Sequence, residues 1–122
     1  MARILVVDDS KTILKMVVHY LKDEGHELVT ADDGRIGLDL FEGEKGNFQL
    51  VLTDINMPNM NGYELSDKIR TGEINKDVPI VVLSTEESAK SKEEGKKVGV
   101  SAWVVKPPQQ ELLVKVVKHF LG

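Results

Sequence analysis

The sequence predicts a doubly wound α/β fold with five parallel strands and five helices. Short apolar runs alternate with longer amphipathic stretches along all 122 residues. Four of the five runs are continuously apolar, which is typical of strands buried on both faces of a parallel sheet. Five βα units in one small domain favour the sheet order 2-1-3-4-5, with the switch point between the first and third strands.

The predicted strands are the five short apolar runs. They comprise residues 4–7, 28–30, 50–52, 80–83 and 102–105. The run at 28–30 is shorter and more polar than the others, so we expect it to form an edge strand.

The stretches between the strands carry helical patterns. Apolar residues fall on one stripe within 11–23 and again within 110–121. Weaker patterns around 36–41 and 63–69 predict the second and third helices. Each helix therefore follows one strand, as right-handed crossovers between parallel strands require.

The fourth predicted helix, at residues 87–98, has few apolar positions. Lysine and glutamate dominate it, Gly95 interrupts it, and only Ala89 and Val98 can anchor it to a core. Mobile elements are drawn from the least stable parts of a fold. We therefore expect this helix to belong to a surface that changes with the state of the protein.

Composition excludes several classes of function. The chain has no cysteine, so disulfides, thiolate metal sites and cysteine nucleophiles are absent. Its 16 basic and 20 acidic residues give a net charge of −4, which disfavours non-specific binding to nucleic acid. No apolar run approaches the ~20 residues of a membrane helix. With no signal peptide pattern either, we expect a cytoplasmic protein.

Polar and charged side chains follow four of the predicted strands. They are Asp8 and Asp9 after the first, Asp54 after the third, Ser84 and Thr85 after the fourth, and Lys106 after the fifth. In a parallel sheet these strand ends lie at one edge, where ligands bind. We therefore expect one site that contains three carboxylates, a hydroxyl and an ammonium.

Three carboxylates this close repel one another and raise one another's pKa unless a cation is present. Mg²⁺ prefers oxygen ligands and retained waters, which matches this set. We expect Asp9 and Asp54 to be direct ligands and Asp8 to act through water. No histidine lies at a strand end, which argues against zinc.

The lysine indicates that an anion enters beside the metal, since lysine binds phosphate as a point charge. A carboxylate can act as a nucleophile and carry a phosphoryl group. Asp54 suits that role because its strand lies nearest the centre of the site. Mg²⁺ and Lys106 would neutralise the transferred group, and Ser84 could donate to one of its oxygens.

These residues resemble the receiver domain of bacterial response regulators over nearly the whole chain, and most closely the single-domain, chemotaxis-type receivers. The matching segments are Val6-Val7-Asp8-Asp9-Ser10, Asp54-Ile55-Asn56-Met57-Pro58-Asn59-Met60-Asn61-Gly62, Ser84 and Lys106-Pro107. The resemblance implies a flavodoxin-like fold. It also implies that a sensor histidine kinase phosphorylates Asp54.

The resemblance implies further roles at the site. Asp8, Asp9 and Asp54 form the acidic pocket, and the backbone carbonyl of Asn56 is a further Mg²⁺ ligand. Lys106 contacts the phosphoryl group, and its bond to Pro107 is cis.

The resemblance also implies switch residues. Ser84 moves toward the phosphoryl group and draws the following loop inward. Trp103 stands where the family usually has tyrosine or phenylalanine, an aromatic that swings inward on activation; the bulkier indole puts that swing in question. Asn56 and Glu86 hold the positions that tune phosphoryl lifetime, and we expect loss of the group within seconds to minutes.

The output is expected to be a protein contact. The chain starts at Met1 and ends just after the last helical pattern, so we expect residues 1–122 to be one receiver domain without an output domain. The expected target binds the surface of the fourth helix, fifth strand and fifth helix, and the protein is a monomer or a weak dimer. Alternatives are a phosphate sink or phosphorelay intermediate, a magnesium phosphohydrolase, or a scaffold without phosphorylation.

Overall fold

The computed structural model describes residues 2–122, in which five strands and five helices alternate. The strands are β1 (Arg3–Val7), β2 (Glu27–Ala31), β3 (Leu50–Thr53), β4 (Ile80–Ser84) and β5 (Ala102–Val105). The helices are α1 (Lys11–Lys22), α2 (Gly34–Gly43), α3 (Gly62–Thr71), α4 (Ala89–Lys97) and α5 (Gln110–Leu121). All ten predicted elements are present. No helix within residues 2–122 is long and apolar enough to cross a membrane.

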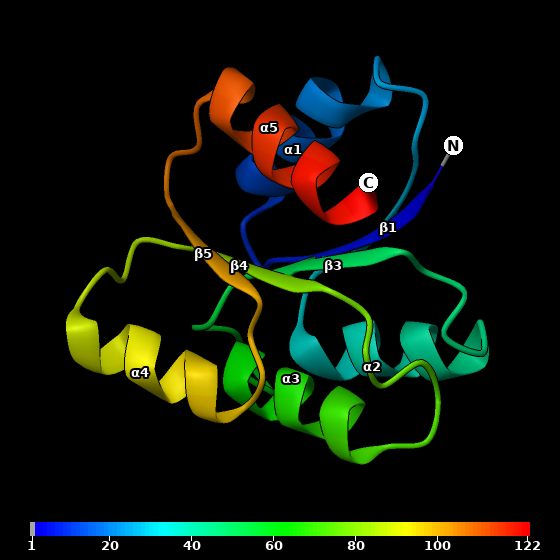
Figure 1. The fold of residues 1–122 in the computed structure, drawn as a ribbon, viewed down its shortest axis with the longest axis vertical. Helices are drawn as coiled ribbons and strands as arrows, with labels where there is room; N and C mark the ends of the chain where they lie inside the picture. The colour runs from blue at the N-terminus through cyan, green and yellow to red at the C-terminus, as the bar shows by residue number, and fades with distance from the viewer. Residues whose placement is uncertain (1) are drawn as a thin grey trace.

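The sheet is parallel and has the predicted order β2-β1-β3-β4-β5. Helices α1 and α5 cover one face, and α2, α3 and α4 lie along the other (Figure 1). The switch point falls between β1 and β3, where Val7 is paired with Thr53. The residues that follow these two strands therefore start from adjacent positions.

The core has two halves, one on each face of the sheet. Alternate residues of the central strands point to opposite faces, so each strand contributes to both halves. The half toward α2 and α3 contains Leu5, Val7, Leu38, Phe41, Val51, Leu65, Ile69 and Ile80. The half toward α1 and α5 contains Ile4, Val6, Val17, Leu21, Leu52, Val81, Leu83, Leu113 and Val117. Burial on both faces fixes the central strands, and with them the strand ends that carry the site.

The two edge strands differ from the prediction in one respect. β2 is an edge strand, as its short polar run predicts. β5 is the other edge, and its burial on both faces was predicted wrongly: Val104 is buried, whereas Val105 is exposed. The physical reason is that the last strand of an open sheet has a neighbour on one side only, so its apolar run is not fully covered.

Helix α4 is held by little buried surface. Gly95 is its only fully buried residue. Ser88 caps its N-terminus by accepting a hydrogen bond from the Ser91 N–H at 3.1 Å. The Tyr63 hydroxyl of α3 donates to the Ser91 carbonyl at 2.9 Å. Hydrogen bonds and a glycine contact, rather than an apolar stripe, thus hold the helix.

Candidate functional site

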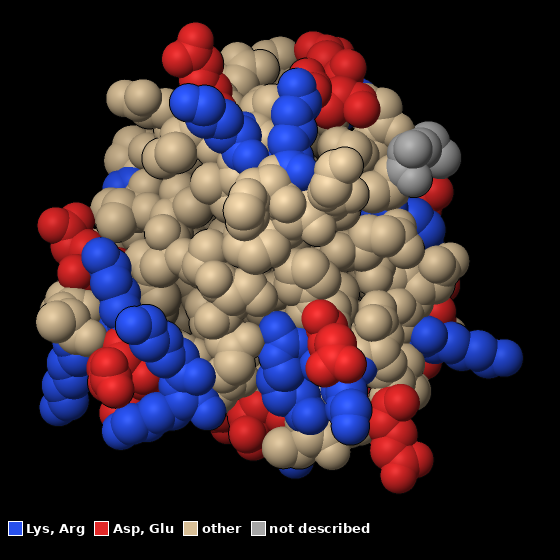
Figure 2. Space-filling model, in the orientation of Figure 1, with Lys and Arg blue, Asp and Glu red and all other residues tan. Residues whose placement is uncertain are grey.

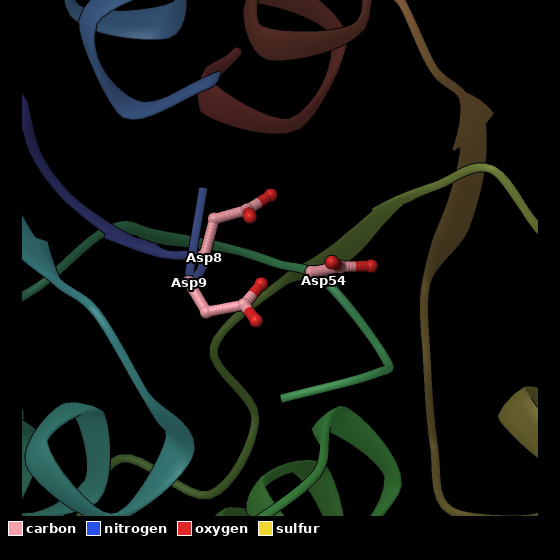
Figure 3. A group of neighbouring side chains, drawn as sticks. All are labelled: Asp8, Asp9 and Asp54. Atoms are coloured by element: carbon pink, nitrogen blue, oxygen red, sulfur yellow. The ribbon is translucent and has the colours of Figure 1, made fainter. Parts of the chain in front are cut away.

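Three carboxylates meet where β1 and β3 end. One oxygen of each of Asp8, Asp9 and Asp54 lies within 4.8 Å of the others, and Figure 3 shows the three side chains together. Asp8 and Asp54 are buried, whereas Asp9 is exposed. The Asp8 N–H donates to the Ala31 carbonyl at 3.0 Å and the Asp54 N–H to the Val7 carbonyl at 2.9 Å. Hydrogen bonds to the neighbouring strands therefore fix the backbone positions of Asp8 and Asp54 at the site.

Lys106 reaches the same carboxylates from the end of β5. Its Nζ lies 2.9 Å from Asp54 Oδ2, to which it donates a hydrogen bond, and 2.6 Å from Asp8 Oδ2. The Lys106 N–H donates to the Ser84 carbonyl at 2.9 Å, and the bond to Pro107 is cis. The strand ends thus bring together the acids, the lysine and Ser84.

The charges at this site are unevenly compensated. Burial raises the pKa of Asp8 above its ordinary value, and the nearby Lys106 offsets only part of that effect. Burial works to lower the pKa of Lys106, but its contacts with Asp8 and Asp54 outweigh burial and raise it. The ammonium therefore stays charged at neutral pH, and the pocket carries more negative than positive charge.

The donor set fits Mg²⁺. The three clustered side chains all offer carboxylate oxygens, which this ion prefers. Asp8 Oδ2 is buried, and its partner is the Lys106 ammonium 2.6 Å away, which also pairs with Asp54. Two buried carboxylates that share one ammonium are incompletely compensated, and a cation beside them would offset the remaining negative charge.

The loop between β3 and α3 closes the site on one side. Asp54 Oδ1 accepts a hydrogen bond from the Ile55 N–H at 2.7 Å. The Gly62 N–H donates to the Ile55 carbonyl at 2.9 Å, which closes the base of the loop. Asn56 is exposed in the loop, two residues after Asp54. Its carbonyl is the backbone group that sequence resemblance assigned to the metal.

Ser84 and Glu86 are joined to their own loop. Ser84 is buried, and its Oγ accepts a hydrogen bond from the Glu86 N–H at 3.2 Å. The Glu86 side chain accepts from the Ser91 hydroxyl of α4 at 3.2 Å. In this conformation both side chains serve the connection between β4 and α4.

Trp103 ties that connection to β5. Its indole N–H donates to the Glu86 carbonyl at 2.7 Å. The edge of its ring lies over Gly95, where an added Cβ would be 3.1 Å from Trp103 Cζ3. A larger residue at position 95 would meet the indole, so the absence of a side chain there makes room for tryptophan.

Gly95→Ala is therefore expected to leave the free energy of unfolding within about 0.5 kcal/mol of the wild type. Alanine favours a helix interior by about 1 kcal/mol over glycine, and displacement of the indole offsets that gain. Trp103 is the only tryptophan, so its fluorescence should shift. The matched control is Gly43→Ala in α2, which meets nothing within 4 Å. It should stabilise the protein by about 0.5–1 kcal/mol without a change in fluorescence. Equal stabilisation by both variants, with unchanged emission, would contradict the contact.

The structure adds two residues that the sequence did not single out for the site. The Asn59 side chain donates to Asp33 Oδ2 at 2.9 Å and so joins the loop after Asp54 to the start of α2. Asn59 lies within a segment that carries the family resemblance, but its residue type alone is typical of a turn and assigns it no role at the site. An aspartate before Gly34 at a helix start is a signal for an N-cap, but it gives no indication of a partner 26 residues away.

Comparisons with known proteins agree with this architecture. The family described as "Response regulator receiver domain" matches residues 4–118. Protein PilH of Pseudomonas aeruginosa is 32% identical over 122 residues, which are 100% of this chain and 99% of that protein. Chemotaxis protein CheY-3 of Vibrio cholerae is 37% identical over 106 residues, 86% of this chain and 80% of that protein. The solved structure of Vibrio cholerae chemotaxis protein CheY4 at low pH matches with a TM-score of 0.90, at 42% identity and 98% coverage of both chains.

Proposed function

This chain belongs to the family of response regulator receiver domains, and from that premise we propose that Asp54 accepts a phosphoryl group from a sensor histidine kinase. The chain is a two-component signalling protein of the chemotaxis type rather than an enzyme with an external substrate. We further propose that the phosphorylated form binds a target protein.

The cluster of Asp8, Asp9 and Asp54 with Lys106 carries this proposal. In the transfer, an Asp54 carboxylate oxygen forms a bond to phosphorus. The bond from phosphorus to the kinase histidine breaks, and its electron pair stays on the imidazole nitrogen. Lys106, whose Nζ lies 2.9 Å from Asp54 Oδ2, stays beside the phosphoryl oxygens and compensates their charge.

Mg²⁺ would be held by Asp8, Asp9, Asp54 and the Asn56 carbonyl. When bound, it supplies positive charge to the acceptor carboxylate and the incoming phosphoryl group. The cluster of carboxylate oxygens from Asp8, Asp9 and Asp54, which one ammonium compensates only in part, supports this assignment. Asn56 and Glu86 are proposed to tune hydrolysis of the phosphorylated form.

The proposed target surface consists of α4, β5 and α5. Val105 and Leu112 are large apolar residues that are exposed there, 36% and 47% respectively. Lysine side chains crowd over α4, at the lower left of Figure 2, beside an uncharged central area. The exposed lysines of α4 are Lys90, Lys92, Lys96 and Lys97. These lysines lie among the exposed Glu93 and Glu94 of the same helix, so the charge beside the exposed apolar residues is mixed. Val105 and Leu112 suit a partner that contributes apolar side chains.

Phosphorylation is proposed to reach this surface through the connection between β4 and α4. The Ser84 hydroxyl would turn toward the phosphoryl group. This movement would break the hydrogen bond that Ser84 Oγ now accepts from the Glu86 N–H. Glu86 also accepts the indole hydrogen bond of Trp103, so a shift of this loop changes the support of α4. The new charge at Asp54 thereby biases the population of α4 positions.

We also propose that residues 1–122 act as one receiver domain, in the cytoplasm, as a monomer or a weak dimer.

The intact mass after incubation with acetyl phosphate tests the function. We expect one phosphoryl adduct on the wild type, formed only with Mg²⁺ and lost within minutes after the donor is removed. Asp54→Asn should form none. Asp32→Asn, which changes an exposed carboxylate nearby, should behave as the wild type. Purified histidine kinase should give the same pattern.

Three kinds of outcome would overturn the proposal. An adduct on Asp54→Asn, or one independent of Mg²⁺, would remove Asp54 or the metal from the reaction. No adduct despite demonstrated Mg²⁺ binding, with either donor, would favour a scaffold. Steady release of phosphate without an adduct would favour a phosphohydrolase.

A further inference from the structure

The loop that connects β3 to α3, residues 54–61, is attached to α2 as well as to its own strand and helix. The Asn59 Nδ2 donates a hydrogen bond to Asp33 Oδ2 at 2.9 Å. The Met60 carbonyl lies against Gly34, where an added Cβ would be only 2.1 Å from the oxygen. The tip of the loop therefore rests on the first residues of α2.

Asp33, which accepts the hydrogen bond from Asn59, is itself held in place. It is buried, and its other oxygen, Oδ1, accepts the N-cap hydrogen bond from the Ile36 N–H at 2.8 Å. The two hydrogen bonds, from the Ile36 N–H first and from Asn59 second, lower the pKa of Asp33, so its carboxylate is ionised at neutral pH. Both of its oxygens are therefore committed acceptors.

The helix behind Asp33 is itself held firmly. Gly37 of α2 lies so near β1 that an added Cβ would be 2.9 Å from Val7 Cγ2. Val7 directly precedes the acidic pair of the site. The attachment of Asn59 to Asp33 thus connects the loop to the strand that carries Asp8 and Asp9.

Asn59 has a backbone that suits this role. Its φ of 67° lies in the left-handed region, which asparagine tolerates better than most residues. This conformation lies three residues beyond Asn56, whose carbonyl is the proposed backbone ligand. A movement of the loop tip therefore moves that carbonyl as well.

We propose that the hydrogen bond between Asn59 and Asp33 positions the loop so that the Asn56 carbonyl faces the acidic pocket, and that it thereby sets the affinity for Mg²⁺. Asp33 and Asn59 are positioning residues, since neither belongs to the proposed ligand set. The inference rests on the proposed function, because it concerns the same metal site. Partners of this kind commonly change metal affinity by about 10–100-fold when they are removed.

A donor–acceptor exchange tests the inference. Asp33→Asn keeps an oxygen for the N-cap but replaces the acceptor of Asn59 by an amide donor. Asn59→Asp places a second carboxylate against Asp33. The double variant lets the amide at position 33 donate to the carboxylate at position 59, so the hydrogen bond returns with its direction reversed and the net charge unchanged.

The exchange separates positioning from simple charge. Asn59→Asp adds a negative charge near the site, and charge alone would strengthen Mg²⁺ binding. The positioning role predicts the opposite, namely weaker binding by roughly tenfold. Asp33→Asn should also weaken binding, and the double variant should return to within about twofold of the wild type. Asp32→Asn measures the effect of one lost nearby charge.

The measurements are the Mg²⁺ dissociation constant by titration calorimetry and amide hydrogen exchange of residues 55–60 in metal-free protein. Both single variants should speed exchange in this segment, and the double variant should slow it again. Thermal unfolding verifies that all variants are folded.

Tighter or unchanged Mg²⁺ binding by Asn59→Asp would overturn the inference, as would a double variant no better than the single ones. If the wild type is phosphorylated with Mg²⁺ and only these variants fail to behave as described, the proposed function stands and the positioning role falls. If the wild type itself neither binds Mg²⁺ nor becomes phosphorylated, both fall.

Discussion

Gly62→Ala is expected to lower the free energy of unfolding by about 3 kcal/mol, at the upper end of overpacking effects. An added Cβ at this position would lie 2.1 Å from the Asp54 carbonyl oxygen and 3.0 Å from Ile55 Cα. Both neighbours are backbone atoms, so no side-chain rotation relieves the overlap. The start of α3 would have to move away from the end of β3.

The loss should affect the chemistry as well as the fold. The overlapping carbonyl belongs to Asp54, the proposed phosphoacceptor, and the hydrogen bond from the Gly62 N–H to the Ile55 carbonyl closes the same loop. We therefore expect slower phosphorylation of Gly62→Ala under conditions in which the variant is still folded.

Urea denaturation of Gly62→Ala, Gly43→Ala and the wild type measures the effect. Gly43 meets no atom within 4 Å, and a substitution there should stabilise the protein by about 0.5–1 kcal/mol. The two variants make the same chemical change and differ in surroundings. A loss below about 1 kcal/mol at Gly62 would contradict the tight contact between α3 and β3.

The strands and helices could be predicted because hydrophobic periodicity reports burial. Continuous apolar runs mark strands that are covered on both faces, and the central strands β1, β3 and β4 have this pattern and this burial. The exposure of Val105 could not be predicted, since an apolar run does not tell whether a second protein or the same chain covers it. The exposed Val105, whose burial was predicted wrongly, lies on the proposed target surface.

The acidic cluster and Lys106 could be predicted because each residue directly follows a strand, and parallel strands end at one edge. The contact between Asp33 and Asn59 could not. Both residues lie in connections whose path depends on packing, such as the close approach of Gly34 to the Met60 carbonyl. Their amino acid types are those of a cap and a turn, which leaves their partners undetermined.

Without Mg²⁺, Asp8→Asn is expected to raise the free energy of unfolding at pH 7 by about 1–2 kcal/mol, whereas Lys106→Met should lower it by about 3 kcal/mol. Asp8 is 1% exposed, and its Oδ2 relies on the Lys106 ammonium 2.6 Å away. Asp8 and Asp54 share this ammonium, and Asp9 is the third carboxylate of the cluster. Loss of one carboxylate relieves repulsion, while loss of the ammonium leaves two buried carboxylates uncompensated.

The advantage of Asp8→Asn should depend on pH with a definite sign. Burial raises the pKa of Asp8 above its ordinary value of 3.8. Between the ordinary and the raised pKa the folded state binds more protons than the unfolded state, so wild-type stability falls as pH rises through that interval. The penalty is complete above the raised pKa and absent below 3.8. The difference between Asp8→Asn and the wild type should therefore shrink on acidification and vanish below that value.

Urea denaturation of both proteins across this pH range, with and without Mg²⁺, measures the difference. Asp32→Asn, which alters an exposed carboxylate, should show no such pH dependence. A destabilised Asp8→Asn protein, or a difference that is constant with pH, would contradict the burial argument.

Mg²⁺ should reverse the order of the two proteins. A metal at one hundred times its dissociation constant stabilises the wild type by about 2.7 kcal/mol, and Asp8→Asn should gain less because it lacks one acidic group of the proposed site. The carboxylate that destabilises the metal-free fold is then the one that strengthens the metal-bound fold. A site that gathers like charges to bind a ligand is expected to lower the stability of the ligand-free fold. This expectation accounts for two buried acids, Asp8 and Asp54, beside a single lysine, where folding alone would favour one acid.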